Sequence, residues 1–232
     1  MLAGILTPQA NTTVESEMRV LLPREVGSVV ARLTCPSPDS RERLLQYFHG
    51  VHDTLAQFDT APIAIAGFAC TGSTYLVGAE AESASFARAR VPLISAASAV
   101  ARALKALRAR KIALLSPYPE WLTQACVAFW RSQEVEVVAI GTPPGDRSDT
   151  RRIYGLAAAD ARAGLAALEC SRADAVLISG TGMPTLAAIR DARGSLPVLS
   201  SNLCLAWYLC DFFSTQTIDQ WLEPQAAWRS RL

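Results

Sequence analysis

Short apolar runs alternate with amphipathic stretches along the whole chain. The clearest run is residues 63–69 (IAIAGFA), which stops at the small residues Cys70, Thr71, Gly72 and Ser73. A continuous apolar run of this length is typical of a strand buried within a parallel sheet. Similar runs predict seven further strands, at residues 3–7, 26–33, 91–95, 111–115, 135–140, 175–179 and 197–200.

Helical periodicity fills the stretches between these runs. It predicts helices at residues 14–22, 41–58, 75–89, 96–108, 121–133, 151–169, 185–192 and 203–213. Residues 142–150 (TPPGDRSDT) form a turn-rich loop, and the tail from Ser214 has little periodicity. Strands that alternate with helices in this way predict an α/β fold with parallel sheets.

Three segments recur in the same order and at nearly the same spacing. Residues 4–8 (GILTP) resemble 113–117 (ALLSP), 64–72 resemble 174–182, and 91–95 resemble 196–200. The repeat predicts two Rossmann-like half-domains related by a pseudo-twofold axis. We expect the first to comprise residues 1–95 with 203–232 and the second residues 96–202. Since ligands bind at the carboxyl ends of parallel strands, we expect the active site in the cleft between the halves.

Composition and charge narrow the function classes. Half of the 232 residues are hydrophobic, which allows a sizeable core, and 22 basic residues nearly balance 21 acidic ones. This balance gives no reason to expect a nucleic-acid partner. The apolar runs are far shorter than the roughly 20 residues of a membrane span, and the N-terminus lacks a signal-peptide pattern. We therefore expect a cytoplasmic protein with no membrane partner, and a homodimer if it oligomerises.

The six cysteines form no C-x-x-C pair and match no zinc spacing, so we expect free thiols and no metal. Most are predicted to be small core residues. Cys70 differs because it ends a predicted strand and faces the start of a helix. Backbone N–H groups and the helix dipole at that position favour the thiolate, the reactive form of cysteine. Cys70 is therefore the candidate centre of chemistry.

Five segments together resemble the aspartate/glutamate racemase superfamily, and more narrowly its maleate cis–trans isomerase and arylmalonate decarboxylase branch. They are Thr7-Pro8 with residues 11–15, Ala69-Cys70-Thr71 with Ser73, residues 116–118, residues 179–185 and residues 197–202. Members of this superfamily act on small carboxylic acids without a metal or organic cofactor. The resemblance therefore implies a small-acid substrate and no cofactor.

The resemblance also implies roles for individual residues. Cys70 matches the nucleophile, whereas Asn11 and Tyr118 match positions that hold substrate carboxylates. Loops that cradle a carboxylate are matched by four residues: Thr71, Ser73, Thr181 and Gly182. Asn202, after the third repeated strand, is a further substrate-binding candidate. Gly180 takes the position of the second cysteine, and the decarboxylases typically have the reverse arrangement, with glycine first and cysteine second.

The glycine at position 180 affects the three candidate reactions differently. Racemisation with two bases suffers most, because glycine offers no acid or base to one face of the substrate. Isomerisation of a maleate-like diacid needs one thiolate nucleophile and donors that hold the negative charge. Decarboxylation of an arylmalonate needs one thiol as proton donor. We expect the isomerase. The decarboxylase with Cys70 as proton donor, an aspartate/glutamate racemase and a non-catalytic small-acid binding protein are the alternatives.

Overall fold

Two four-stranded parallel sheets form the framework of the protein. The computed structural model describes residues 1–232. The first sheet has the order β2-β1-β3-β4, with β1 (Leu2–Pro8), β2 (Gly27–Leu33), β3 (Ile65–Phe68) and β4 (Leu93–Ser95). The second has the order β6-β5-β7-β8, with β5 (Lys111–Leu115), β6 (Glu136–Gly141), β7 (Ala175–Ile178) and β8 (Val198–Ser200). The predicted α/β fold and all eight predicted strands are confirmed.

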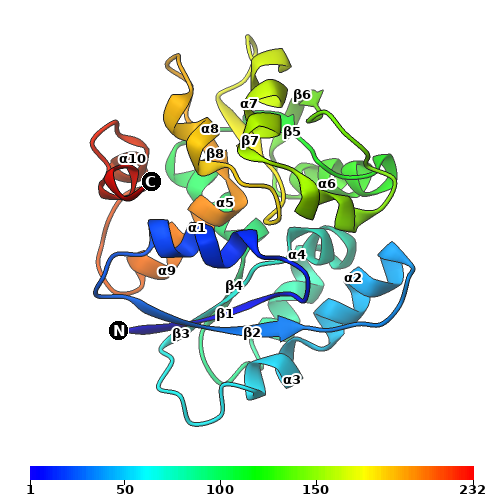
Figure 1. Cartoon of the computed structure of the whole chain (residues 1–232), viewed down its shortest axis with the longest axis vertical. Coiled ribbons are helices and arrows are strands. Elements are labelled where there is room, and N and C mark those ends of the chain that lie inside the picture. Colours follow the sequence, from blue (N-terminus) through cyan, green and yellow to red (C-terminus); the bar gives the residue numbers. More distant parts are fainter.

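The strand order is the same in both sheets, as the internal repeat predicts. β1 and β5 each pair with the two strands that follow them in their own sheet, in parallel register. The inner strands β3 and β7 are buried along their whole length, which explains their continuous apolar sequences. Figure 1 shows the first sheet in the lower part of the molecule and the second in the upper part.

Helices cover the faces of both sheets. Those that follow the first sheet's strands are α1 (Thr13–Leu21), α2 (Ser40–His49), α3 (Val51–Ala56), α4 (Thr71–Phe86) and α5 (Ala96–Ala106). Those that follow the second sheet's strands are α6 (Glu120–Ser132), α7 (Ala158–Ala167), α8 (Leu186–Asp191) and α9 (Ser201–Asp211). No helix is both long enough and apolar enough to cross a membrane.

Helix α9 joins the two halves. It begins directly after β8 of the second sheet, yet it packs against α1 and α5 and lies on β3 of the first sheet. The contact with β3 is close: a Cβ atom added to Gly67 would lie 3.1 Å from Cδ1 of Leu205. The buried side chains of both sheets consequently form one continuous hydrophobic core.

Two predicted helices are each broken at a glycine. The helix predicted at 41–58 is in fact α2 and α3, because Gly50 (φ −81°, ψ 8°) leaves the helical conformation between them. The helix predicted at 151–169 begins as a separate 3₁₀ helix, η1 (Thr150–Gly155), followed by α7. Leu156 and Ala157 between these two are extended. In both cases the apolar spacing continues through the break, so periodicity alone did not reveal it.

Two further boundaries differ from the prediction. Helix α4 starts at Thr71, directly after Cys70, rather than at residue 75, and it is kinked at Gly78 (φ 81°, ψ 164°). The tail, for which no element was predicted, contains α10 (Ile218–Leu222) and the 3₁₀ helix η2 (Ala227–Arg231). The early start of α4 matters for function, because it places Cys70 directly at the helix N-terminus.

Candidate active site

Cys70 lies buried between the end of β3 and the first residue of α4. Its Sγ atom is 3.1 Å from Oγ of Ser73, one turn into the helix. Ser73 in turn donates its hydroxyl hydrogen to the carbonyl oxygen of Leu44, at 2.7 Å. Because a hydroxyl has one hydrogen to give, Cys70 is the donor in its pair with Ser73. The hydrogen-bonding pattern therefore contains a neutral thiol.

The pKa of Cys70 agrees with this pattern. Burial raises the pKa of the thiol, and the side-chain and backbone hydrogen bonds with Ser73 lower it only in part. The sequence left the protonation state of Cys70 open, and the buried surroundings favour the thiol although the helix N-terminus favours the thiolate. Desolvation penalises the charged form more than the helix end stabilises it. Cys70 rests as a thiol and must release its proton when it reacts as a nucleophile.

Thr71 and Tyr118 form a pair of hydroxyl groups beside the thiol. Oγ1 of Thr71 and Oη of Tyr118 are 2.5 Å apart, and both residues are buried. Thr71 follows β3 and Tyr118 follows β5, so the pair bridges the ends of one central strand from each sheet. Burial strongly raises the pKa of Tyr118, which keeps its phenol protonated. One hydroxyl donates to the other, so the pair offers one free hydrogen to a carboxylate or an enediolate, and a second when the mutual bond opens.

A second polar link connects the loop after β1 with the loop after β7. Nδ2 of Asn11 donates to Oγ1 of Thr181 at 3.0 Å, and Thr181 donates to the carbonyl oxygen of Ala69 at 2.9 Å. Oγ1 of Thr13 donates to the carbonyl oxygen of Gly182 at 2.7 Å. These bonds hold the Thr181 loop against Cys70 and its neighbours.

The site is a small cavity of about 30 Å³. Five of the predicted site residues line it: Cys70, Thr71, Tyr118, Thr181 and Gly182. Ser73 and Asn11 do not line it but bond to residues that do. Asn202 lies outside it, since its amide donates to Glu17 at 2.8 Å and to the carbonyl oxygen of Thr181 at 3.0 Å. In the structure Asn202 supports the Thr181 loop from behind.

Gly180 also lies outside the cavity lining. Its backbone conformation favours glycine over any residue that has a side chain. Its φ of +91° is one that other residues rarely adopt. The space next to it is filled by Ile153 of η1. Likewise, a Cβ atom added to Gly182 would lie 2.7 Å from two ring atoms of Tyr154. The 3₁₀ helix η1 therefore forms the wall where a second catalytic side chain would stand.

Sequence reasoning missed the part of the lining that comes from α2 and η1. Its members are Arg43, Leu44, Tyr47, Thr150, Ile153 and Tyr154. The internal repeat indicates only the loops that follow strands. These six residues lie in helical segments, so the repeat gave no signal for them. A much larger groove of about 580 Å³ lies at α7 and α8, away from Cys70. We place the site in the small cavity because the reactive groups gather there. No three His, Cys, Asp or Glu side chains lie close enough to hold a metal ion.

Comparison with known proteins places the chain in the branch of the racemase superfamily that its sequence predicts, a branch of isomerases and decarboxylases. Residues 51–220 match the family model for arylmalonate decarboxylase. The chain belongs to the arylmalonate decarboxylase family. It is 27% identical over 227 residues to a maleate isomerase of Geobacillus stearothermophilus, covering 85% of this chain and 86% of that protein.

Two solved structures show how widely this fold is shared. One is a maleate cis–trans isomerase of Nocardia farcinica, a cysteine-to-serine mutant with a covalently bound succinylcysteine intermediate. Its TM-score is 0.77 at 22% identity, over 91% of this chain and 92% of that one. The other is arylmalonate decarboxylase, with a TM-score of 0.74 at 19% identity, over 92% and 93% of the two chains.

Proposed function

We propose that the protein is a cofactor-independent isomerase of a maleate-type diacid, with Cys70 as its single thiol. The observation that carries this proposal is the placement of Cys70 and the Thr71–Tyr118 hydroxyl pair in the lining of one small cavity. The similarity to maleate isomerases over most of the chain supports it. A thiol that can add to a double bond stands next to donors that can hold the resulting charge.

The reaction needs no group besides those in the cavity. Sγ of Cys70 forms a bond to one alkene carbon, and the π electrons move toward the adjacent carboxylate, which becomes an enediolate. The thiol hydrogen passes to an oxygen of that enediolate, held by Thr71 and Tyr118. The former double bond is now single and rotates. Elimination then breaks the C–S bond, restores the double bond in the trans form and returns the hydrogen to sulfur.

The covalent adduct on one sulfur agrees in kind with the succinylcysteine intermediate of the Nocardia farcinica isomerase. The low identity between the two chains limits that likeness to the fold, so the role of Cys70 rests on its own surroundings. Gly180 counts against two-base racemisation, since neither it nor Ile153 beside it can give or take a proton.

Decarboxylation of a substituted malonate is the second candidate, favoured by the thiol form of Cys70. Loss of carbon dioxide leaves an enediolate on the Thr71–Tyr118 pair. The S–H bond of Cys70 then breaks and its hydrogen forms a C–H bond on one face of that carbon. Solvent returns a proton to the thiolate. The family model is compatible with this reaction as well.

Proton NMR of the protein with maleate, phenylmalonate and both enantiomers of aspartate and glutamate tests the proposal. We expect conversion of maleate to fumarate, reduced by several orders of magnitude in Cys70→Ala. Cys204→Ala is the matched control, because Cys204 is equally buried but lies outside the cavity. Phenylacetate formation would select the decarboxylase, and α-proton exchange of an amino acid the racemase. Ligand binding without turnover, unchanged in Cys70→Ala, would indicate a binding protein.

A further inference from the structure

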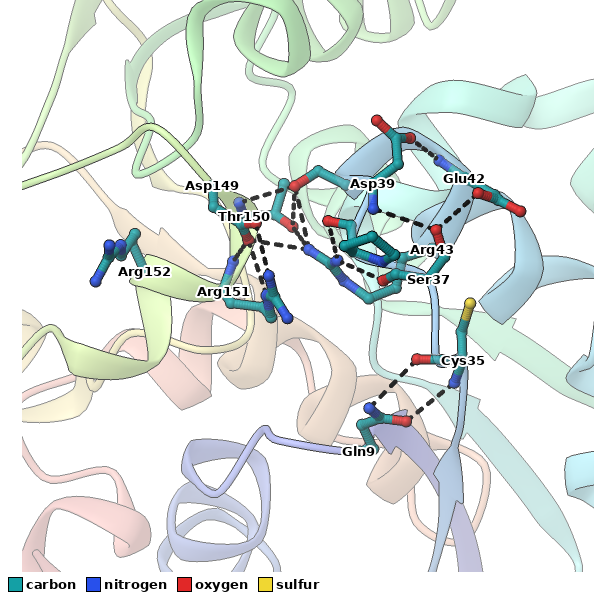
Figure 2. A network of polar contacts seen from close by, with 12 residues as sticks. Gln9, Cys35, Ser37, Asp39, Glu42, Arg43, Asp149, Thr150, Arg151 and Arg152 are labelled. Atoms are coloured by element: carbon teal, nitrogen blue, oxygen red, sulfur yellow. Dashed lines mark hydrogen bonds and ion pairs between the residues drawn. The ribbon is translucent and has the colours of Figure 1, made fainter.

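The cavity has a second polar side, built around the buried guanidinium of Arg43. The side chain of Arg43 is 2% exposed and lines the cavity together with Tyr47 and Tyr154. Its two terminal nitrogens make five hydrogen bonds, and its Nε makes none. Nη1 donates to the carbonyl oxygens of Ser37 and Pro38, and Nη2 donates to Ser40, Asp149 and Thr150 (Figure 2). A cation is thus held rigidly in the wall of the cavity that Cys70 also lines.

This cation is incompletely neutralised. Asp149 pairs with Arg43 at 2.9 Å and also with Arg151 at 3.1 Å, so two guanidiniums share one carboxylate. Partial burial acts to raise the pKa of Asp149, but hydrogen bonds from Arg151 and the charge of Arg43 lower it to about 2. Asp149 is therefore ionised, and the cluster carries one surplus positive charge. Arg151 is 54% exposed, so solvent screens part of this surplus, whereas the buried guanidinium of Arg43 depends on Asp149 or on another anion in its place.

The size of the cavity shows that binding must change this wall. A cavity of about 30 Å³ has room for only a few water molecules, whereas a four-carbon diacid has eight non-hydrogen atoms. Ile153 and Tyr154 of η1 form part of the wall. Their helix is tied to α2 by the bonds of Arg43 to Asp149 and Thr150. The guanidinium that holds η1 against α2 is therefore also the cation with which a substrate anion would pair.

We propose that Arg43 binds the second carboxylate of the diacid substrate, and that Asp149 occupies that place in the empty site. The inference rests on the proposed function and specifies its substrate class. The Thr71–Tyr118 pair takes the carboxylate that becomes the enediolate, and Arg43 takes the other. Exchange of one carboxylate for another at Arg43 releases η1 as the substrate enters. Monocarboxylic acids lack the second anion and bind without Arg43.

Calorimetric binding to the whole protein tests this role with two unreactive probes, succinate as the diacid and butyrate as the monoacid. In Arg43→Met we expect succinate to bind about 30- to 100-fold more weakly, as when one partner of a buried charge pair is removed. Butyrate binding should change by less than about threefold. Arg41→Met is the matched control, because Arg41 is on the same helix but exposed, over the ring of Trp121.

A second variant tests the exchange itself. Asp149→Asn removes the resident anion at nearly constant size, so succinate should bind several-fold more tightly. Weaker succinate binding in Asp149→Asn, or equal losses for succinate and butyrate in Arg43→Met, would show that Arg43 is only a structural tie. If Arg43→Met does not fold, Arg43→Lys replaces it, because lysine keeps the charge but loses the fork of donors.

The outcome is separable from that of the proposed function. Turnover of maleate by the unmodified protein with no effect of Arg43→Met on succinate would refute this inference alone. Selective loss of succinate binding in Arg43→Met, in a protein that does not convert maleate, would support the diacid site and refute the isomerase.

Discussion

Ile153 fills the space that a side chain at Gly180 would need. A Cβ atom added to Gly180 would lie 2.7 Å from Cδ1 of Ile153 and 3.1 Å from Oη of Tyr118. Real Cβ atoms essentially never approach other atoms as closely as the first of these distances. The backbone of Gly180, with φ of +91°, adds a conformational penalty for any other residue. The one-thiol site is therefore a property of packing and backbone as well as of a missing thiol.

Gly180→Cys should consequently fail to create a two-base racemase. We expect a loss of about 2–4 kcal/mol of unfolding free energy, from the strained φ together with overpacking against Ile153. Denaturant unfolding measures this. The double variant Gly180→Cys with Ile153→Ala relieves the overlap but not the strain, so it should be less destabilised by the cysteine than the single variant. A single variant as stable as the parent, which exchanges the α-proton of aspartate, would contradict the argument.

The raised pKa of Cys70 predicts its reactivity with pH. Burial raises this pKa above its usual value and hydrogen bonds with Ser73 lower it in part, so the thiol is neutral near pH 7. Alkylation of Cys70 by iodoacetamide, followed by mass spectrometry of its peptide, should be slow at neutral pH and accelerate in alkaline solution. In Ser73→Ala the acceleration should move to higher pH, because the hydroxyl that can turn from Leu44 to donate to the thiolate is lost. A rate that is already maximal at pH 6–7 would refute the resting thiol.

The raised pKa of Cys70 also predicts how the stability of the fold changes with pH. A thiol whose pKa is higher in the folded than in the unfolded chain contributes stability that is fully present below the unfolded value of about 8.5. That contribution is lost as the pH rises through the folded value. Cys70→Ala should therefore flatten part of the alkaline fall in stability measured by denaturant unfolding between pH 8 and 10.

Tyr118→Phe should lower kcat by roughly 10²–10³-fold and raise KM by much less, because the phenol binds the substrate carboxylate but bonds most strongly to the charge that develops during the reaction. Steady-state kinetics with maleate measures the effect. Tyr75→Phe is the matched control: Tyr75 is also buried, but its hydroxyl bonds Ser179 at 2.9 Å and it does not line the cavity. A control as inactive as Tyr118→Phe would mean that loss of buried hydroxyls, rather than loss of a charge-stabilising donor, explains the result.

The strands could be predicted because each is a short apolar run ended by turn residues. Residues that follow the carboxyl ends of these strands were then predicted as site residues. Three of them, Cys70, Tyr118 and Thr181, line one cavity in the structure. Parallel strands place their ends at a common edge, so order along the chain was sufficient. This part of the site follows from local pattern and from the repeat.

The remaining wall could not be predicted, because nothing in a helical pattern tells which neighbour a helix will face. Arg43 reads as a charged residue of an amphipathic helix, and only the docking of η1 buries it. Ile153 reads as an ordinary core residue. Asn202 was placed in the site from its position after a strand, yet its amide serves Glu17. Contacts between the halves decided the cases of Arg43 and Asn202, and packing of η1 against the loop after β7 decided that of Ile153.

Glu17 makes the clearest of these contacts between the halves. It lies buried in α1, and its carboxylate accepts hydrogen bonds from both backbone N–H groups at Thr185 and Leu186, at 2.5 and 3.1 Å. It also accepts from the hydroxyl of Thr185 at 3.0 Å and from the amide of Asn202 at 2.8 Å. The four donors belong to the elements that follow β7 and β8. One carboxylate thereby positions the loop that carries Thr181.

Glu17→Ala should cost about 3–5 kcal/mol of unfolding free energy, because it leaves several buried donors without an acceptor. Glu15→Ala is the matched control on the same helix. Glu15 is 36% exposed and pairs with Arg32, and a surface pair of this kind contributes no more than about 1 kcal/mol. Denaturant unfolding of both variants measures the difference. Equal losses would refute the role of Glu17, whereas a selective loss would show that a buried carboxylate far from the thiol keeps the two halves of the site in place.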